Sequence, residues 1–243
     1  MDYSSLKKAI FERQSVREYT DAPVPALDGD VDFVKAFGLT EIFPAPYKIV
    51  LLKDGEAVKN KRSKYCIGFY ASDDYGSLEN VGFVGELLSL YLHTIGVGTC
   101  WWGMKKPDRT YRTEDGLSFC ISMSAGIPTG SLTRTPDGFK RNAVTEIANE
   151  SDGLIEAVRV APSAMNNQPW KIEKKGNAYH FYIKKPKNLL ERFFLAEMRK
   201  IDTGIAMAHL YVAALADGYT VTVKADGQNT ADATYVATLK IEK

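Results

Sequence analysis

Two long apolar segments dominate the pattern of hydrophobic and polar positions along the chain. The first extends from Asn80 to Gly96 and the second from Asp202 to Gly218. Each begins at a side chain that can cap a helix N-terminus and ends at a glycine suited to the left-handed conformation of a helix C-terminus. The spacing from cap to glycine is 16 residues in both segments. The pattern therefore predicts two long helices that are buried on most sides.

Strands are predicted before and after each helix. Residues 46–52 form a short apolar run that is followed by a Lys-Asp-Gly turn. Residues 169–173 form a similar run 123 residues later and are followed by Lys-Lys-Gly-Asn. The two helices are 122 residues apart, and β-rich runs follow them at residues 117–123 and 234–241. These near-constant offsets favour an internal duplication, although any α+β protein places strands and helices in series.

The sequence therefore predicts an α+β fold made of two duplicated halves that together form one globular unit. We assign residues 1–130 to the first half and 145–243 to the second. The turn-rich residues 128–138 connect them.

Composition narrows the function classes. The chain has 243 residues, 45% of them hydrophobic and 25% charged, which is ordinary for a soluble globular protein. A net charge of +1 does not indicate binding to nucleic acid or to an anionic membrane. Three isolated cysteines without a CxxC pair, and an N-terminus without a signal peptide, make a reducing cytoplasm the expected location. The apolar residues 81–104 contain Glu86 and His93, so a buried helix is favoured over a membrane span.

An arginine-rich motif closes the first amphipathic helix, which we predict over residues 6–13. Arg13 and Arg17 flank Ser15, an arrangement that suits a phosphate through two guanidinium groups and one neutral donor. A solvated helix end is the alternative, and composition alone favours it.

A second motif lies at residues 161–170, with sequence APSAMNNQPW. Three side-chain amides and a hydroxyl stand between prolines, directly before a predicted strand. Amides offer donors and acceptors together, as recognition of an amide-rich heterocycle needs. A turn-rich linker is the alternative, but Gln168 and Trp170 are poor linker residues, so binding is favoured.

Residues 96–103, with sequence GVGTCWWG, are a third candidate, because glycines let backbone approach a flat ligand closely. A helix end followed by a buried strand explains them equally well. Lys140 and Arg141 are a weaker candidate for phosphate contact. The chain has no phosphate loop, no GxGxxG and no HExxH, and its three histidines are scattered. We therefore expect no catalytic side chain and no metal, and a cofactor must supply any reactivity.

Together these segments resemble the FMN-dependent nitroreductase family, in which an RxSxR element grips the FMN phosphate and an APSxxNxQPW loop and a GxGTCW segment reach the flavin. The resemblance covers most of the chain and implies an oxidoreductase that passes hydride from NAD(P)H through FMN to a nitroaromatic, quinone or similar small acceptor. It implies the following cofactor-binding residues: Arg13, Gln14, Ser15, Arg17, Trp102, Gly103, Lys140, Arg141, Pro162, Ser163, Ala164, Asn166 and Gln168. Three alternatives stay open: an FMN carrier or sensor without turnover, another flavin reaction such as reductive dehalogenation, and a non-flavin interaction protein.

The order of the motifs departs from the family pattern. The APSxxNxQPW loop lies in the second half, whereas the first half has no amide cluster at residues 33–39 or 43–46, and the second half has no RxSxR. In the family dimer these parts come from different subunits. The chain thus resembles a single-chain subgroup in which a fused, degenerate dimer keeps one FMN site and can be a monomer. Residues 33–46 and 189–198 are candidates for shaping the acceptor pocket.

Overall fold

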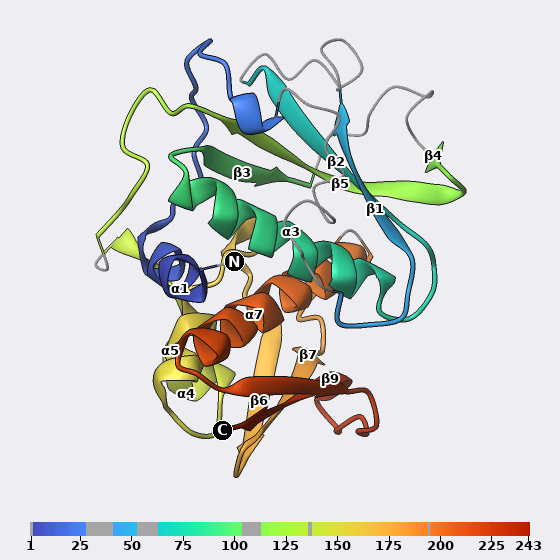
Figure 1. The fold of residues 1–243 in the computed structure, drawn as a ribbon. Coiled ribbons are helices and arrows are strands. Elements are labelled where there is room, and N and C mark those ends of the chain that lie inside the picture. The colour runs from blue at the N-terminus through green and yellow to red at the C-terminus, as the bar shows by residue number, and fades with distance from the viewer. Residues whose placement is uncertain (1, 28–40, 53–62, 104–112, 136–137, 194) are drawn as a thin grey trace.

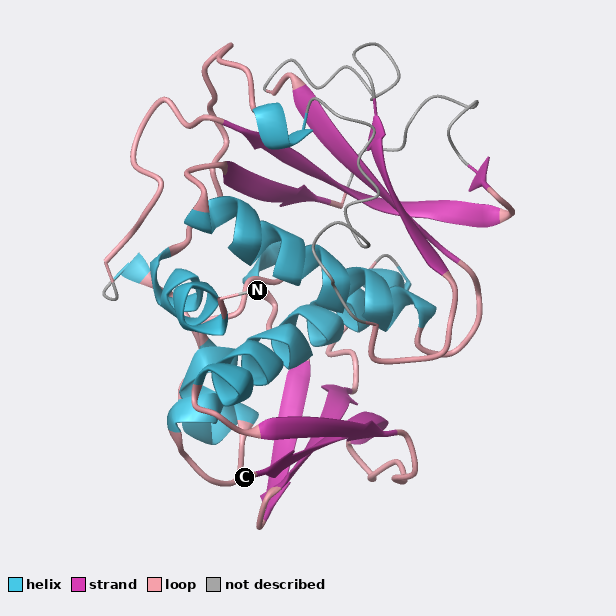
Figure 2. Cartoon of the chain, viewed as in Figure 1, coloured by secondary structure: helices cyan, strands magenta, loops and turns pink. Residues whose placement is uncertain are grey.

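The protein is organised in three layers, with helices between two antiparallel sheets, as a computed structural model shows (Figures 1 and 2). The structure describes all residues except 1, 28–40, 53–62, 104–112, 136–137 and 194. The predicted α+β fold is confirmed. Of residues 33–46, which we consider for the acceptor pocket, residues 33–40 lie outside the described residues.

The helical layer and the two sheets contain the following elements. The helices and short 3-10 turns are α1 (Tyr3–Glu12), η1 (Pro25–Leu27), α3 (Ser77–Thr94), α4 (Val144–Ile147), α5 (Gly153–Arg159), η4 (Ala164–Asn166), α6 (Leu189–Phe193) and α7 (Ala196–Ala216). The strands of the first sheet are β1 (Tyr47–Leu52), β2 (Tyr65–Ala71), β3 (Gly98–Trp102), β4 (Thr113–Glu114) and β5 (Leu117–Gly126). The strands of the second sheet are β6 (Trp170–Lys175), β7 (Ala178–Lys184), β8 (Thr220–Lys224) and β9 (Ala233–Glu242).

The two sheets share one strand order. The first reads β1-β2-β5-β3 and the second β6-β7-β9-β8, so each places its third long strand at the edge beside its fourth. Both also have a register shift at a Phe-Tyr step, at Phe69/Tyr70 in β2 and at Phe181/Tyr182 in β7. A duplicated chain would have this likeness, and the duplication itself stays a prediction.

The long helices α3 and α7 cross at two glycines. A Cβ on Gly82 would lie 1.9 Å from the carbonyl oxygen of Ile201, and a Cβ on Gly204 would lie 2.1 Å from that of Glu79. Only glycine allows backbones this close. The two contacts are reciprocal, because Gly82 and Gly204 are 122 residues apart in the chain and so are Glu79 and Ile201. The predicted packing of two buried helices is therefore confirmed.

The predicted helix starts are wrong. Helix α3 begins at Ser77 after Gly76, and α7 begins at Ala196, so Asn80 and Asp202 lie inside the helices. Both side chains are buried and bind loops of the fold instead of their own helix ends. The predicted C-termini are confirmed, since Gly96 and Gly218 have φ of +84° and +79°.

Several smaller expectations also have an outcome. Strand β1 is half-buried rather than buried, apart from Leu52, because it lies at the edge of its sheet. The first helix ends at Glu12, one residue before the predicted end. None of the three cysteines forms a disulfide. In the part of the chain that the structure describes, no helix has the length and hydropathy to cross a membrane.

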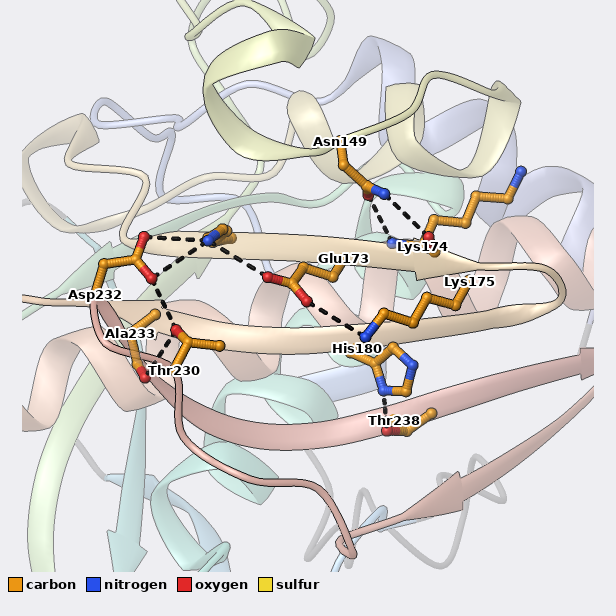
Figure 3. Close-up of polar contacts among 10 residues, drawn as sticks. Asn149, Glu173, Lys174, Lys175, His180, Thr230, Asp232, Ala233 and Thr238 are labelled. Atoms are coloured by element: carbon orange, nitrogen blue, oxygen red, sulfur yellow. Dashed lines mark hydrogen bonds and ion pairs between the residues drawn. The ribbon is translucent and has the colours of Figure 1, made fainter.

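The second sheet carries a polar network on its outer face (Figure 3). Asp232 binds Lys171 at 3.1 Å, and Glu173 lies 3.8 Å from Lys175. His180 shares a 2.8 Å hydrogen bond with Thr238 on the neighbouring strand. His180 thus bonds to a neighbouring strand of the second sheet.

Candidate functional site

The arginine-rich segment follows the first helix and runs beside β3. Ser15 pairs with Thr99 in a parallel bridge, and the Val16 N–H donates to the Thr99 carbonyl at 2.9 Å. A Cβ on Gly98 would lie 2.6 Å from the Val16 side chain, so glycine is needed for this close approach. The first and third sequence motifs are thus adjacent.

Arg13 is the buried cation of this segment, with a relative exposure of 3%. Its Nη1 lies 3.8 Å from Oε1 of Glu86, whereas its Nε and Nη2 are buried without a hydrogen-bond partner. Unsatisfied buried donors on a charged group are costly and rare in native proteins. An anion bound at this edge of the guanidinium would satisfy them.

Glu86 lies at the centre of a buried network that joins both halves. Its carboxylate accepts from Trp101 Nε1 at 3.0 Å and contacts His209 Nε2 at 3.2 Å, while His209 Nδ1 faces the Ala157 carbonyl at 2.8 Å. Burial by itself raises the pKa of Glu86, but the Arg13 charge and the His209 hydrogen bond outweigh it and lower this pKa. The expectation of a satisfied core histidine is confirmed for His209. His93 is half-buried on α3.

The connection between the halves is fastened to the end of α1. The Gln14 amide donates to the carbonyls of Ser131 at 2.6 Å and Thr133 at 3.2 Å, and the Arg134 N–H donates to the Glu12 carbonyl at 2.9 Å. Gln14 therefore holds this connection through its side chain.

Arg141 joins that connection to the APSAMNNQPW loop. Its guanidinium donates to oxygens of the second half and of its own neighbour, namely Val160 O, Ala161 O, Asn166 Oδ1 and Lys140 O. Burial, together with the nearby charges of Arg134 and Arg13, lowers the pKa of Arg141 to about 10. The structure thus gathers cations from residues 13, 134 and 141, with Glu86 as a buried carboxylate beside them.

The loop itself holds a strained backbone. Met165, Asn166 and Gln168 all have positive φ, between 48° and 55°, which non-glycine residues rarely adopt. Ser163 Oγ accepts from the Gln168 N–H at 3.0 Å, and Gln168 Oε1 accepts from the Asn142 N–H at 2.8 Å. Strain of this kind persists where surrounding contacts impose it and is concentrated at functional sites.

Asp202 of α7 anchors the start of this strained stretch. Its two carboxylate oxygens lie 3.0 and 3.2 Å from the Ala164 N–H, and the side chain is 4% exposed. Burial raises the pKa of Asp202 to about 8, against the opposing effects of the Ala164 hydrogen bond and the Arg199 charge.

The remaining predicted residues lie around this centre. Trp102 donates to Ser124 Oγ at 3.0 Å, and a Cβ on Gly103 would lie 3.0 Å from the Met198 sulfur at the start of α7. Arg17 and Lys140 are exposed, and Pro162 and Ala164 are half-buried. The structure therefore brings Lys140 and Arg141 into contact with the loop, and Arg13 is near enough to Arg141 for its charge to lower the pKa of Arg141. Trp102 and Gly103 lie at the end of β3, where Gly103 faces Met198 of α7.

Sequence reasoning missed Glu86 and Arg134 as parts of this site. Glu86 had a signal, because a carboxylate in the middle of an apolar helix must be paired. Arg134 had none, since it stands in a turn-rich connection whose path beside α1 depends on the fold. No cluster of three or more potential metal ligands occurs within the described ranges.

The family assignment rests on a comparison with protein families. A family described as "Putative TM nitroreductase" matches residues 5–214. The chain therefore belongs to this nitroreductase family and is an oxidoreductase of that class. A comparison with curated proteins found no match to the chain.

A solved structure from Thermotoga maritima supports the fold, and two others are reported beside it. A "putative nitroreductase" from Thermotoga maritima is 23% identical, with 98% of this chain and 94% of that chain covered and a TM-score of 0.65. An "FMN-dependent Nitroreductase" from Clostridium difficile is 17% identical over 56% of this chain and 94% of its own, with a TM-score of 0.40. A "Putative NADH dehydrogenase/NAD(P)H nitroreductase" from Parabacteroides distasonis is 18% identical over 61% and 98%, with a TM-score of 0.44.

Proposed function

We propose that this chain is an FMN-dependent oxidoreductase that takes hydride from NAD(P)H and passes it to a small acceptor such as a nitroaromatic or a quinone. The observation that carries the proposal is the buried Arg13, whose two orphaned nitrogens call for an anion. The FMN phosphate is an anion of the right chemistry, because its oxygens accept the N–H bonds that a guanidinium presents. The residues present therefore fit FMN.

Each part of the site has its own task in this proposal. Arg13, Ser15, Lys140 and Arg141 bind the phosphate. The Ser163, Asn166 and Gln168 side chains, held by the strained loop, address the ribityl chain and ring. The backbone of Trp102 and Gly103 would contact the ring, and Arg17 would stabilise negative charge on it.

FMN supplies the redox chemistry when bound, transferring two electrons between nicotinamide and acceptor. The chain's own work is then binding, orientation and electrostatics. This explains why the sequence offers no nucleophile or acid–base pair: the described site is rich in cations and amides and holds no exposed histidine.

The test begins with the absorbance spectrum of the purified protein and a count of released flavin per chain. NAD(P)H oxidation with nitroaromatic and quinone acceptors follows on the flavin-loaded protein. Bound FMN with turnover supports the proposal, and bound FMN without turnover favours a carrier or sensor. A colourless protein that takes up no added FMN overturns it.

A further inference from the structure

Arg134 lies beside Arg13 because the connection between the halves is fastened to α1. Thr133 forms an antiparallel bridge with Arg13, and the Arg134 N–H donates to the Glu12 carbonyl at 2.9 Å. Figure 1 shows this stretch passing next to α1 on its way from β5 to α4. The backbone at Arg134 therefore runs beside the end of α1, one residue from the position that pairs with Arg13.

The Arg134 guanidinium is held in place on one side and unsatisfied on the other. Its carbon lies 3.8 Å from the centre of the Phe139 ring, and its Nη1 donates to the Gly138 carbonyl at 3.2 Å. Its Nε is buried without a hydrogen-bond partner, as are Nε and Nη2 of Arg13. Two neighbouring guanidiniums thus each present a buried N–H edge that no described protein group accepts.

The local charge is unbalanced toward the positive. Burial and the Arg13 charge both lower the pKa of Arg134, and Arg134 and Arg13 in turn lower the pKa of Arg141. Among the described residues, the ion pair made by this cluster is that of Arg13 with Glu86. Three cations with one carboxylate repel one another, and a dianion placed among them would remove that cost.

We propose that Arg134 is a further phosphate-binding residue, which joins Arg13 and Arg141 in a three-guanidinium site for a phosphate monoester. This inference rests on the proposed function, since it assigns the monoester to FMN. Arg134 belongs neither to the RxSxR motif nor to the Lys140-Arg141 pair. A phosphate monoester fits because it carries close to two negative charges at pH 7 and three acceptor oxygens, enough for several N–H edges at once.

The experiment measures FMN and riboflavin affinities of the flavin-free full chain by quenching of flavin fluorescence. Riboflavin lacks the phosphate, so the ratio of the two affinities isolates what the phosphate contributes. We expect Arg134→Gln to weaken FMN binding about 10- to 100-fold, as loss of a hydrogen bond to a charged group does, and to change riboflavin binding less than twofold. Arg134→Lys keeps the charge but loses the planar set of guanidinium donors. Its FMN affinity should lie between those of the wild type and Arg134→Gln.

Arg159→Gln is the matched control. Arg159 is close enough to lower the pKa of Arg141, but its Nε is already bonded to Glu156 at 2.7 Å. Arg159→Gln therefore removes a nearby charge without removing an unbonded Nε–H. We expect it to change the FMN affinity less than threefold. The melting temperature of the flavin-free Arg134→Gln protein should equal or exceed that of the wild type, because a repelling cation is gone.

The outcomes separate the two proposals. If the wild type binds no flavin, the proposed function fails and this inference with it. If FMN binds in preference to riboflavin but Arg134→Gln leaves the ratio unchanged, or lowers both affinities alike, only the role of Arg134 is overturned. If inorganic phosphate raises the melting temperature of the wild type and FMN does not compete with it, the site takes free phosphate and the assignment to FMN is wrong.

Discussion

Asp202→Asn should stabilise the flavin-free protein at neutral pH. Asp202 is buried in α7 with its carboxylate against the Ala164 N–H, and burial raises its pKa to about 8, from 3.8 for a free aspartate. Between these two values the folded protein keeps the proton and the unfolded chain has lost it. Folding then requires proton uptake, so the stability contribution of this group falls as pH rises through that window.

The size of this stability penalty follows from the pH range between the unfolded and folded pKa values of Asp202. Each pH unit between 3.8 and 7 costs 1.36 kcal/mol, so the penalty at pH 7 is on the order of 4 kcal/mol relative to acid conditions. Asparagine carries no proton to take up, and its carbonyl oxygen can accept the Ala164 N–H. Asn80 already does this in α3, where its Oδ1 accepts from Ile42 N at 3.1 Å and Phe43 N at 3.0 Å.

Urea unfolding of both proteins at pH 5, 6, 7 and 8 gives the measurement. We expect the free energy of unfolding of Asp202→Asn, minus that of the wild type, to grow by about 1.4 kcal/mol per pH unit and to level off near pH 8. Asp232→Asn is the control, since that exposed carboxyl has a lowered pKa through its Thr230 and Lys171 hydrogen bonds and should give a flat difference over this range. A flat difference for Asp202→Asn as well would refute the reasoning.

Three further predictions test the rest of the structure. Glu86→Gln should destabilise the protein by about 3 to 5 kcal/mol in urea unfolding, because it leaves the buried Arg13 without its carboxylate. Saturating FMN should reduce that loss of stability. An undiminished loss would mean that FMN does not compensate the Arg13 charge. Gly82→Ala and Gly204→Ala should each cost about 3 kcal/mol or more, because a Cβ would meet the opposing backbone at 1.9 or 2.1 Å. Gly153→Ala at the start of α5, where a Cβ meets nothing within 4 Å, should be neutral or slightly stabilising, and equal losses at all three glycines would contradict the close helix crossing. Sedimentation together with flavin release should give a monomer with one FMN per chain, and an obligate dimer with two sites per pair, each built across the subunits, would overturn the single-chain reading.

The long helices could be predicted from sequence, but their starts could not. An apolar run with a glycine at its end is sufficient for a helix and its C-terminus, as Gly96 and Gly218 confirm. A polar side chain before such a run looks like a cap whether it binds its own helix or a distant loop. Asn80 and Asp202 bind loops, and those partners are fixed only when the halves fold together.

The site divides in a similar way. Arg13 and the loop at residues 161–170 could be found because their residue types are unusual for a helix end and a linker. Arg134 could not, since its role depends on a connection that returns to the end of α1. Glu86 lies between these cases: its place in an apolar helix shows that it needs a partner, and only the structure names Arg13, His209 and Trp101.

The contrast between Asn80 and Asp202 bears on why a single site is expected. Each stands 16 residues before the glycine that follows its helix, and each binds the loop that enters the first strand of a sheet. In the first half an amide makes four hydrogen bonds and fixes a loop with the apolar residues Phe43 and Ala45. In the second half a carboxyl holds one N–H, and the strained, amide-rich loop follows. The same anchor thus supports an apolar packing contact in one half and, in the other, a polar loop whose side chains bond to Lys140, Arg141 and Asn142.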